Sequence, residues 1–323
     1  MTWIDDATLE RLRRAADSPS LEGTRYTLIG KLGQGGMGGV YRVEDRQLER
    51  HVAMKVISVP DAEGELSRRL LQEARIIARL EHPGIVPIHD TGTLSDGRPY
   101  YAMKLVEGQR LDEYVSGVTT VSDRLRLFLR ICDPVAFAHA RGVLHRDLKP
   151  ANIMVGPFGE VLVMDWGLSR MLFPANKPEP QPDQNALQST DSSAPTQHGT
   201  LLGTPGYMAP EQQTGQPVDA RADIYSLGAV LEFLLTRMNP GSVPRALAAI
   251  QKQSMATNPD QRYQTVKELA KDVEHFLDGL PVRAYPEGPL RRAWRWILRN
   301  RAWLLLLLIY VVVRALLIYF RPR

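Results

Sequence analysis

The most specific stretch of this sequence is His145-Arg146-Asp147-Leu148-Lys149-Pro150-Ala151-Asn152. Two further motifs precede it, the glycine-rich run from Gly33 to Val40 and Val52-Ala53-Met54-Lys55. Two others follow it, Asp165-Trp166-Gly167 and Ala209-Pro210-Glu211. Any one of these motifs alone is weak evidence, whereas five of them in this order and spacing do not arise by chance. The set therefore decides the fold.

The glycine-rich run reads Gly33-Gln34-Gly35-Gly36-Met37-Gly38-Gly39-Val40. Glycines at these spacings let the backbone approach phosphate groups without a Cβ clash. A dinucleotide-binding turn has a similar pattern, but it needs a helix directly after the glycines. Here Val40-Tyr41-Arg42-Val43 continues as a strand, so the pattern favours a strand-turn-strand lid over phosphates.

Lys55 ends a predicted strand, and a lone lysine in that place is usually just solvated. The following segment, residues 66–80, has helical periodicity and contains Glu73. Glu73 can pair with Lys55 and hold its ammonium toward the α- and β-phosphates of a nucleotide. Glu63 and Glu65 are rival partners, but they fall at the exposed start of the helical pattern.

With these motifs the chain resembles the eukaryotic-like (Hanks-type) Ser/Thr protein kinases of bacteria, from about Tyr26 to Asp278. The resemblance implies an α+β, bilobal protein-kinase fold, with a small β-rich N-lobe, a helical C-lobe and a cleft between them. It also implies a signalling enzyme that uses ATP and Mg²⁺, or Mn²⁺, on a protein substrate. We expect a leader at 1–24, a kinase domain at 25–278, a basic juxtamembrane segment at 279–301 and a transmembrane helix at 302–320.

The resemblance also implies a role for each matching residue. Asp147 would be the base that orients the acceptor hydroxyl, and Lys149 would neutralise the transferring phosphoryl group. Asn152 would hold one Mg²⁺, and Asp165 would hold the bridging Mg²⁺. Lys149, two residues after Asp147, is typical of the Ser/Thr branch, as is Gly203-Thr204-Pro205-Gly206-Tyr207.

The same resemblance predicts the nucleotide site. Adenine would lie between Val40, Ala53 and Met154, with Met103 at the back, and the backbone from Lys104 to Val106 would supply its hydrogen bonds. Without the motifs these apolar residues would be interpreted as plain core. The full predicted set of ATP contacts is Leu32, Gly33, Gly35, Gly38, Val40, Ala53, Lys55, Met103, Lys104, Val106 and Met154.

Arg146 suggests regulation. In family members with arginine before the catalytic acid, that arginine pairs with a phosphorylated residue of the activation loop. Residues 174–200 have the composition of a polar loop, and position favours Thr196 or Thr200 as the phosphorylated residue. Autophosphorylation would suit a homodimer. The alternative is a polar linker whose hydroxyls have no role.

The C-lobe departs from the family pattern. The chain passes from Leu234-Leu235-Thr236 almost directly to Val243-Pro244-Arg245, so the segment that normally forms a substrate-docking helix is missing. This departure motivates an alternative, a non-catalytic nucleotide-binding pseudokinase scaffold. A scaffold has no need to keep Asp147, Lys149 and Asn152 together with Asp165, and their presence favours an active kinase.

Composition fits a large globular domain, with 323 residues, 44% of them hydrophobic and 24% charged. The one cysteine, Cys132, excludes an internal disulfide and fits a reducing cytoplasm. The net charge is +4, and eight arginines but no acid lie in residues 291–323. Because this charge adjoins an apolar run, it favours a lipid bilayer as partner and not nucleic acid.

The apolar run at 302–320 contains one charged residue, Arg314. About 20 apolar residues span a bilayer, and tryptophans and tyrosines near both ends suit its interfaces. The arginines before the run place the kinase side in the cytoplasm of a single-pass protein of the bacterial inner membrane. No signal peptide is visible, so the expected form is a tail anchor. An interfacial or buried helix is the rival interpretation.

Overall fold

The computed structural model describes residues 18–34, 38–57, 64–166, 170–171, 206–236 and 243–286, together with 300, 303, 306, 309, 310 and 312–314. Several predicted positions lie outside the described residues, namely Gly35, Gly36, Met37, Gly167, Thr196, Thr200, Gly203, Thr204 and Pro205. Residues 1–17 of the expected leader and most of residues 287–320 lie outside them as well. Within the part of the chain that is described, no helix has both the length and the apolar character needed to cross a membrane.

The N-lobe is built on a five-stranded antiparallel sheet in the order β1-β2-β3-β5-β4. Its strands are β1 (Tyr26–Gln34), β2 (Gly38–Asp45), β3 (Arg50–Ile57), β4 (Ile88–Thr93) and β5 (Pro99–Lys104). Successive side chains of a strand point to opposite faces, so β3 and β5 supply two cores. Met54 and Tyr100 pack on one face, and Ala53, Tyr101 and Met103 pack on the other.

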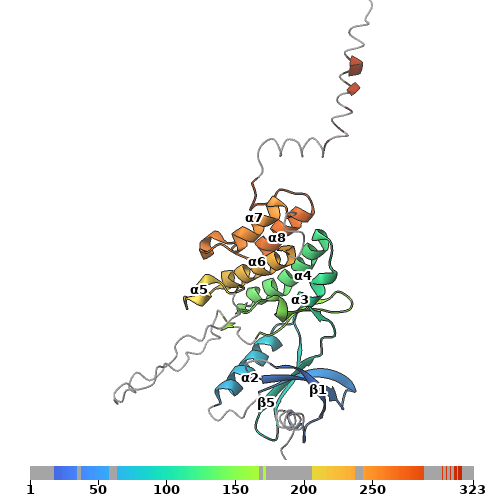
Figure 1. The fold of residues 1–323 in the computed structure, drawn as a ribbon, viewed down its shortest axis with the longest axis vertical. Coiled ribbons are helices and arrows are strands. Elements are labelled where there is room, and N and C mark those ends of the chain that lie inside the picture. The colour runs from blue at the N-terminus through green and yellow to red at the C-terminus, as the bar shows by residue number, and fades with distance from the viewer. Residues whose placement is uncertain are drawn as a thin grey trace, which may run out of the picture.

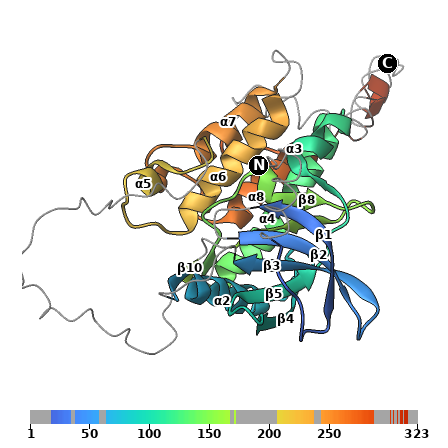
Figure 2. The ribbon, with the colours of Figure 1, turned by 60° about the horizontal axis from the view of Figure 1, so that its bottom comes forward.

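Helix α2 (Glu65–Ala78) covers the second of these faces. Leu70 and Ala74 point from α2 into the same apolar cluster as Tyr101 and Met103 of the sheet. Figure 1 shows α2 beside the sheet in the smaller lobe, and Figure 2 shows it from another side. The helix predicted over residues 66–80 therefore lies where Glu73 can face β3.

The C-lobe is helical, and its centre is α4 (Val121–Ala140) packed against α6 (Ala220–Thr236) and α8 (Val266–Leu277) (Figure 1). Phe128 and Ile131 of α4 are fully buried. Thr120 begins α4 by accepting a hydrogen bond from the Asp123 amide. The other helices are α3 (Leu111–Tyr114), η1 (Val115–Gly117), η2 (Pro150–Asn152), α5 (Pro210–Gln213), α7 (Arg245–Ser254) and η4 (Pro259–Gln261).

Short strands between the lobes hold the loops that matter for function. One small sheet has the order β6-β8-β9 and another pairs β10 with β7. These strands are β6 (Gln109–Arg110), β7 (Val143–Leu144), β8 (Ile153–Val155), β9 (Val161–Val163) and β10 (Arg170–Met171). The predicted α+β, bilobal fold is confirmed.

Where the sequence predicts a shortened C-lobe, α7 lies directly against α6. Gly228 of α6 is the point of closest approach, because a Cβ there would lie 2.7 Å from Ser254 Cβ and 2.7 Å from Met255 Cγ. Leu247 and Ile250 of α7 are fully buried in the main C-lobe core. The helices on either side of the shortening are thus tightly packed.

Both ends of the compact unit extend beyond the motifs. Leu21, within the segment expected as a leader, is buried against the outer face of the N-lobe sheet. After α8, Val282 is buried in the C-lobe core. The backbone amides of Arg283 and Ala284 donate to the Asp272 carboxylate at 2.9 and 3.0 Å. Packed structure therefore continues past Asp278.

Candidate active site

The loop at 145–152, called the catalytic loop below, is anchored from beneath by Asp223 of α6. The backbone amides of His145 and Arg146 donate to its two carboxylate oxygens, each at 2.8 Å. His139 of α4 lies 2.7 Å from the same carboxylate. Complete burial alone would raise the pKa of Asp223, but these partners outweigh burial and lower it, so Asp223 stays ionised.

Within the catalytic loop, the side chains of Asp147, Lys149 and Asn152 are in direct contact. Lys149 Nζ donates to Asp147 Oδ2 at 2.7 Å. The Asn152 amide nitrogen donates to the backbone oxygen of Asp147 at 2.8 Å and to its Oδ2 at 3.1 Å. Lys149 and Asn152 thus hold the Asp147 carboxylate in one position.

A second group forms in the N-lobe. Lys55 Nζ lies 2.9 and 3.0 Å from the two carboxylate oxygens of Glu73, as predicted. The side chains of the rivals Glu63 and Glu65 lie outside the described residues. Burial lowers the pKa of Lys55, but the charges of Glu73 and Asp165 outweigh it and leave the pKa raised, so the ammonium stays charged.

Asp165 contacts the N-lobe group, and its neighbour Trp166 contacts the catalytic loop. Asp165 Oδ1 accepts from Lys55 Nζ at 3.3 Å, and the Asp165 side chain is half exposed. The next residue, Trp166, is buried, and its ring lies 4.6 Å from the ring of His145. Three of the five motifs therefore meet at Asp165 and Trp166, and Trp166 packs in the main core.

The predicted adenine residues gather around β3 and β5. Ala53 and Met103 are paired across these strands and buried in one cluster, against which Val40 and Val106 pack. Met154 lies on β8 and is partly buried. The amide of Lys104 donates to the Pro87 carbonyl at 3.1 Å, so this amide is already engaged within the protein.

The glycine-rich lid has a structural constraint of its own. A Cβ on Gly38 would lie only 2.0 Å from the Val56 carbonyl oxygen, so β2 can approach β3 here only with glycine. Gly33 faces Val40 in the β1–β2 register, and both Leu32 and Gly33 are exposed. The strand after the glycines excludes the dinucleotide-binding alternative.

These residues fit a nucleotide with a divalent cation. Lys55 and Lys149 supply positive charge, while the Asp165 carboxylate and the Asn152 amide offer oxygen ligands of the kind that Mg²⁺ takes. Among the described residues, no group of three or more His, Cys, Asp or Glu side chains could hold a metal by itself. A cation here would need the oxygens of the phosphates as well.

Comparison with known proteins agrees with this geometry. The protein kinase domain family matches residues 26–285. The chain belongs to the protein kinase family. The kinase is 35% identical over 301 residues to the serine/threonine-protein kinase PknD of Protochlamydia amoebophila, covering 79% of this chain and 30% of the relative. It is also 35% identical over 320 residues to PknD of Chlamydia trachomatis, covering 84% of this chain and 34% of the relative.

The crystal structure of the Mycobacterium tuberculosis PknI kinase domain is similar as well. The TM-score is 0.58 at 25% identity, over 79% of this chain and 96% of that chain. The resemblance to bacterial Ser/Thr kinases is confirmed. This kinase spans about a third of the length of the two PknD relatives.

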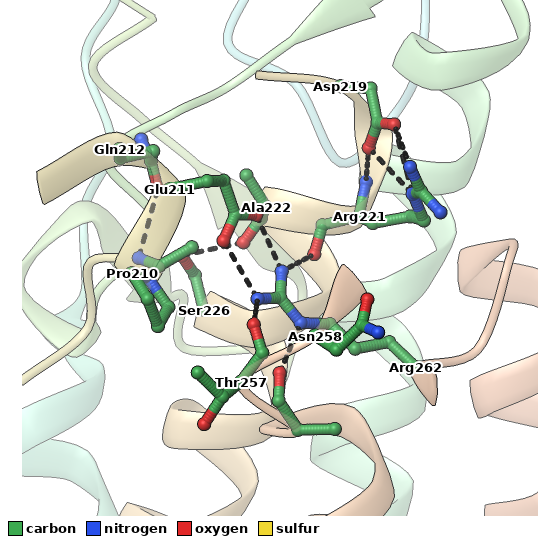
Figure 3. Close-up of polar contacts among 12 residues, drawn as sticks. Pro210, Glu211, Gln212, Asp219, Arg221, Ala222, Ser226, Thr257, Asn258 and Arg262 are labelled. Atoms are coloured by element: carbon green, nitrogen blue, oxygen red, sulfur yellow. Dashed lines mark hydrogen bonds and ion pairs between the residues drawn. The ribbon is translucent and has the colours of Figure 1, made fainter. Parts of the chain in front are cut away.

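Despite the missing segment that the sequence predicts, an ion pair between Glu211 and Arg262 joins α5 to the segment before α8. Arg262 donates to the two Glu211 oxygens at 2.6 and 2.8 Å, and its side chain is fully buried (Figure 3). It also donates to the backbone oxygens of Arg221, Ala256 and Thr257. Every nitrogen of the guanidinium is therefore satisfied, as a buried charge requires.

Two residues that belong to none of the five motifs also contact residues of the candidate site. Tyr101 of β5 donates from its hydroxyl to Glu73 at 2.8 Å. Gln212 of α5 donates to the Arg146 carbonyl at 2.9 Å and accepts from the Ala209 amide at 3.1 Å. Strand alternation alone does not say which residue of β5 lies opposite Lys55, and nothing in the sequence around Gln212 signals its contact.

Proposed function

We propose that this chain is a serine/threonine protein kinase that transfers the γ-phosphoryl group of ATP to a Ser or Thr hydroxyl of a protein. One observation carries the proposal. Lys55, Glu73 and Asp165 form one contact group, and Asp147, Lys149 and Asn152 form another. These are the six side chains that phosphoryl transfer in this family requires.

The chain's own residues would position the reactants. Mg²⁺-ATP supplies the phosphoryl group and much of the counter-charge. Lys55, oriented by Glu73, would hold the α- and β-phosphates, while Asp165 and Asn152 would hold the cation. Asp147 accepts the proton of the acceptor hydroxyl, and Lys149 beside it balances the negative charge that develops on the phosphoryl oxygens.

The pseudokinase alternative is not favoured. It was motivated by the shortened C-lobe, yet the Glu211–Arg262 pair that stabilises this lobe is formed. The residues for phosphate, metal and proton handling are also in contact with one another. A scaffold that only bound nucleotide would gain nothing from the contacts of Asp147.

A transfer assay tests the proposal. The full chain in detergent is incubated with radiolabelled Mg²⁺-ATP and a generic basic protein, beside Asp147→Asn and Lys55→Met variants of equal thermal stability. We expect label on serine or threonine for the wild type and its loss in both variants. Mg²⁺-ATP binding without any transfer by the wild type would instead establish the scaffold.

We also propose that the kinase is regulated by autophosphorylation between two copies, with Arg146 binding phosphorylated Thr196 or Thr200. The support is the charge of the guanidinium and the composition of the loop. Mass spectrometry of the active protein after incubation with ATP tests this proposal. An unmodified loop in an active preparation would contradict it.

We further propose that residues 302–320 tether the kinase to the bacterial inner membrane, with the kinase domain in the cytoplasm. The described apolar side chains in this region are exposed, among them Trp303, Leu306 and Ile309. Arg314, the one charge in the run, donates to the Tyr310 hydroxyl at 2.7 Å. An arginine inside a span costs roughly 2.5–3.5 kcal/mol, which eleven apolar residues from Trp303 to Val313 can offset.

A further inference from the structure

Tyr101 and Lys55 reach toward the same carboxylate from neighbouring strands. They are direct partners in the register of β3 with β5, so their side chains lie on one face of the sheet. Lys55 donates to both oxygens of Glu73, and the Tyr101 hydroxyl donates to Oε1 at 2.8 Å. The buried carboxylate is therefore held from two strands.

Glu73 needs both partners because it is almost fully buried, at 3% exposure. A buried carboxylate that loses a hydrogen bond bears the desolvation cost of that group. Lys55 is shared, since its ammonium also contacts Asp165. The Tyr101 hydroxyl therefore gives Oε1 of Glu73 a second donor that does not depend on Lys55.

The Tyr101 side chain suits this task. Its ring is 2% exposed and packs with Leu70 and Ala74 of α2, so the hydroxyl has a fixed position. Burial raises the pKa of Tyr101 well above its ordinary value, and the Glu73 charge raises this pKa further. The phenol therefore keeps its proton at neutral pH and acts as a donor.

We propose that Tyr101 is a positioning residue for phosphoryl transfer, because its hydroxyl holds the Glu73 carboxylate in the orientation that aims Lys55 at the nucleotide. The inference rests on the proposed kinase activity. It implies that the active position of α2 is stabilised within the N-lobe itself, by a contact between β5 and the helix, and not by the activation loop alone.

The matched pair of variants is Tyr101→Phe and Tyr100→Phe in the full chain. Each removes one hydroxyl oxygen and keeps the ring. Tyr100 lies on the opposite face of the sheet, where its ring packs edge-on against Tyr26. We expect Tyr101→Phe to lower kcat about tenfold at an unchanged KM for the protein substrate, because hydrogen bonds to charged groups are the stronger ones. Tyr100→Phe should retain wild-type kcat.

A double-mutant cycle with Glu73→Met, which removes the acceptor and keeps a side chain of similar length, separates positioning from packing. If Tyr101 acts through Glu73, Tyr101→Phe changes kcat/KM less than twofold in the Glu73→Met background. An equal loss in both backgrounds, a similar loss in Tyr100→Phe, or wild-type kcat in Tyr101→Phe would overturn the inference. Absence of transfer by the wild type, with Asp147→Asn as the blank, would refute the proposed kinase activity instead.

Discussion

At the scale of single residues, the site depends on two backbone positions that L-amino acids rarely adopt. Arg146 has φ of 68° and Asp165 has φ of 57°, both in the left-handed region. Each such residue costs of order 1–2 kcal/mol. The Arg146 amide donates to Asp223, and the Asp165 carboxylate accepts from Lys55. These hydrogen bonds therefore offset the cost of the strained backbone and fix Arg146 and Asp165 in the candidate site.

Gln212 extends this anchoring to the other side of Arg146. Its amide group joins the Arg146 carbonyl to the Ala209 amide, so the start of α5 is tied to the catalytic loop. We expect Gln212→Ala to lower kcat roughly threefold to tenfold, as a lost hydrogen bond in the range of about 0.5–1.5 kcal/mol implies. Steady-state kinetics of the purified full chain measures the effect.

Two control variants make the Gln212 prediction specific. Gln213→Ala removes a bond from the neighbouring side chain to the Met208 carbonyl without touching the catalytic loop, and it should keep wild-type kcat. Gln212→Glu can still accept from the Ala209 amide but places a carboxylate against the Arg146 carbonyl. If Gln212→Glu were as active as the wild type, the bond to Arg146 would have no role in turnover.

At the scale of elements, contacts between residues of the motifs could be predicted from the sequence, whereas contacts set by the register of paired strands could not. The Lys55–Glu73 pair was predictable because one residue follows a strand motif and the other lies on the next helix. Tyr101 was not, because its contact depends on which residue of β5 lies opposite Lys55. The buried ends were missed because Leu21 and Val282 lie beyond all motifs and take part in the core only through tertiary packing.

The shortened C-lobe depends on the pairing between α5 and the segment before α8. Arg262 is fully buried, so removing its partner leaves an uncompensated charge. We expect Glu211→Ala to lower the free energy of unfolding by about 3–5 kcal/mol. Urea unfolding followed by circular dichroism measures this change.

An exposed ion pair provides the control for Glu211→Ala. Arg126 and Asp123 are 3.5 Å apart on the surface of α4, with most of both side chains in solvent. Arg126→Ala should cost less than about 1 kcal/mol. If Glu211→Ala and Arg126→Ala had equal effects, the Glu211–Arg262 pair would not be what holds this lobe together.

At the scale of the whole molecule, the segment after α8 connects the kinase to its C-terminal region. Asp272 accepts hydrogen bonds from the Tyr263 hydroxyl and from the amides of Arg283 and Ala284. The last described residues after α8 are therefore fixed to the C-lobe, on the side away from the N-lobe (Figure 1).

This anchoring predicts where a stable kinase domain ends. A chain ending at residue 278 loses the burial of Val282 and two donors to Asp272, whereas a chain ending at 286 keeps them. We expect the shorter chain to be less stable by about 3 kcal/mol, from one buried aliphatic side chain and the lost hydrogen bonds. Equal thermal unfolding midpoints of the two chains would contradict a structural role for residues 281–285.

The proposed membrane tether makes the last prediction. The full chain, synthesised in the presence of vesicles that contain anionic lipid, should float with them, and a chain ending at 286 should not. A span is held by apolar burial, so the full chain should remain bound at high salt and after an alkaline wash. An interfacial helix held by the eight arginines would be released, because salt screens charges on lipid phosphates. Release by salt would thus support the interfacial alternative, and flotation of neither chain would refute the tether.

In bacterial spheroplasts, protection of the kinase domain from added protease would then establish its cytoplasmic side, and its digestion would reverse the proposed orientation.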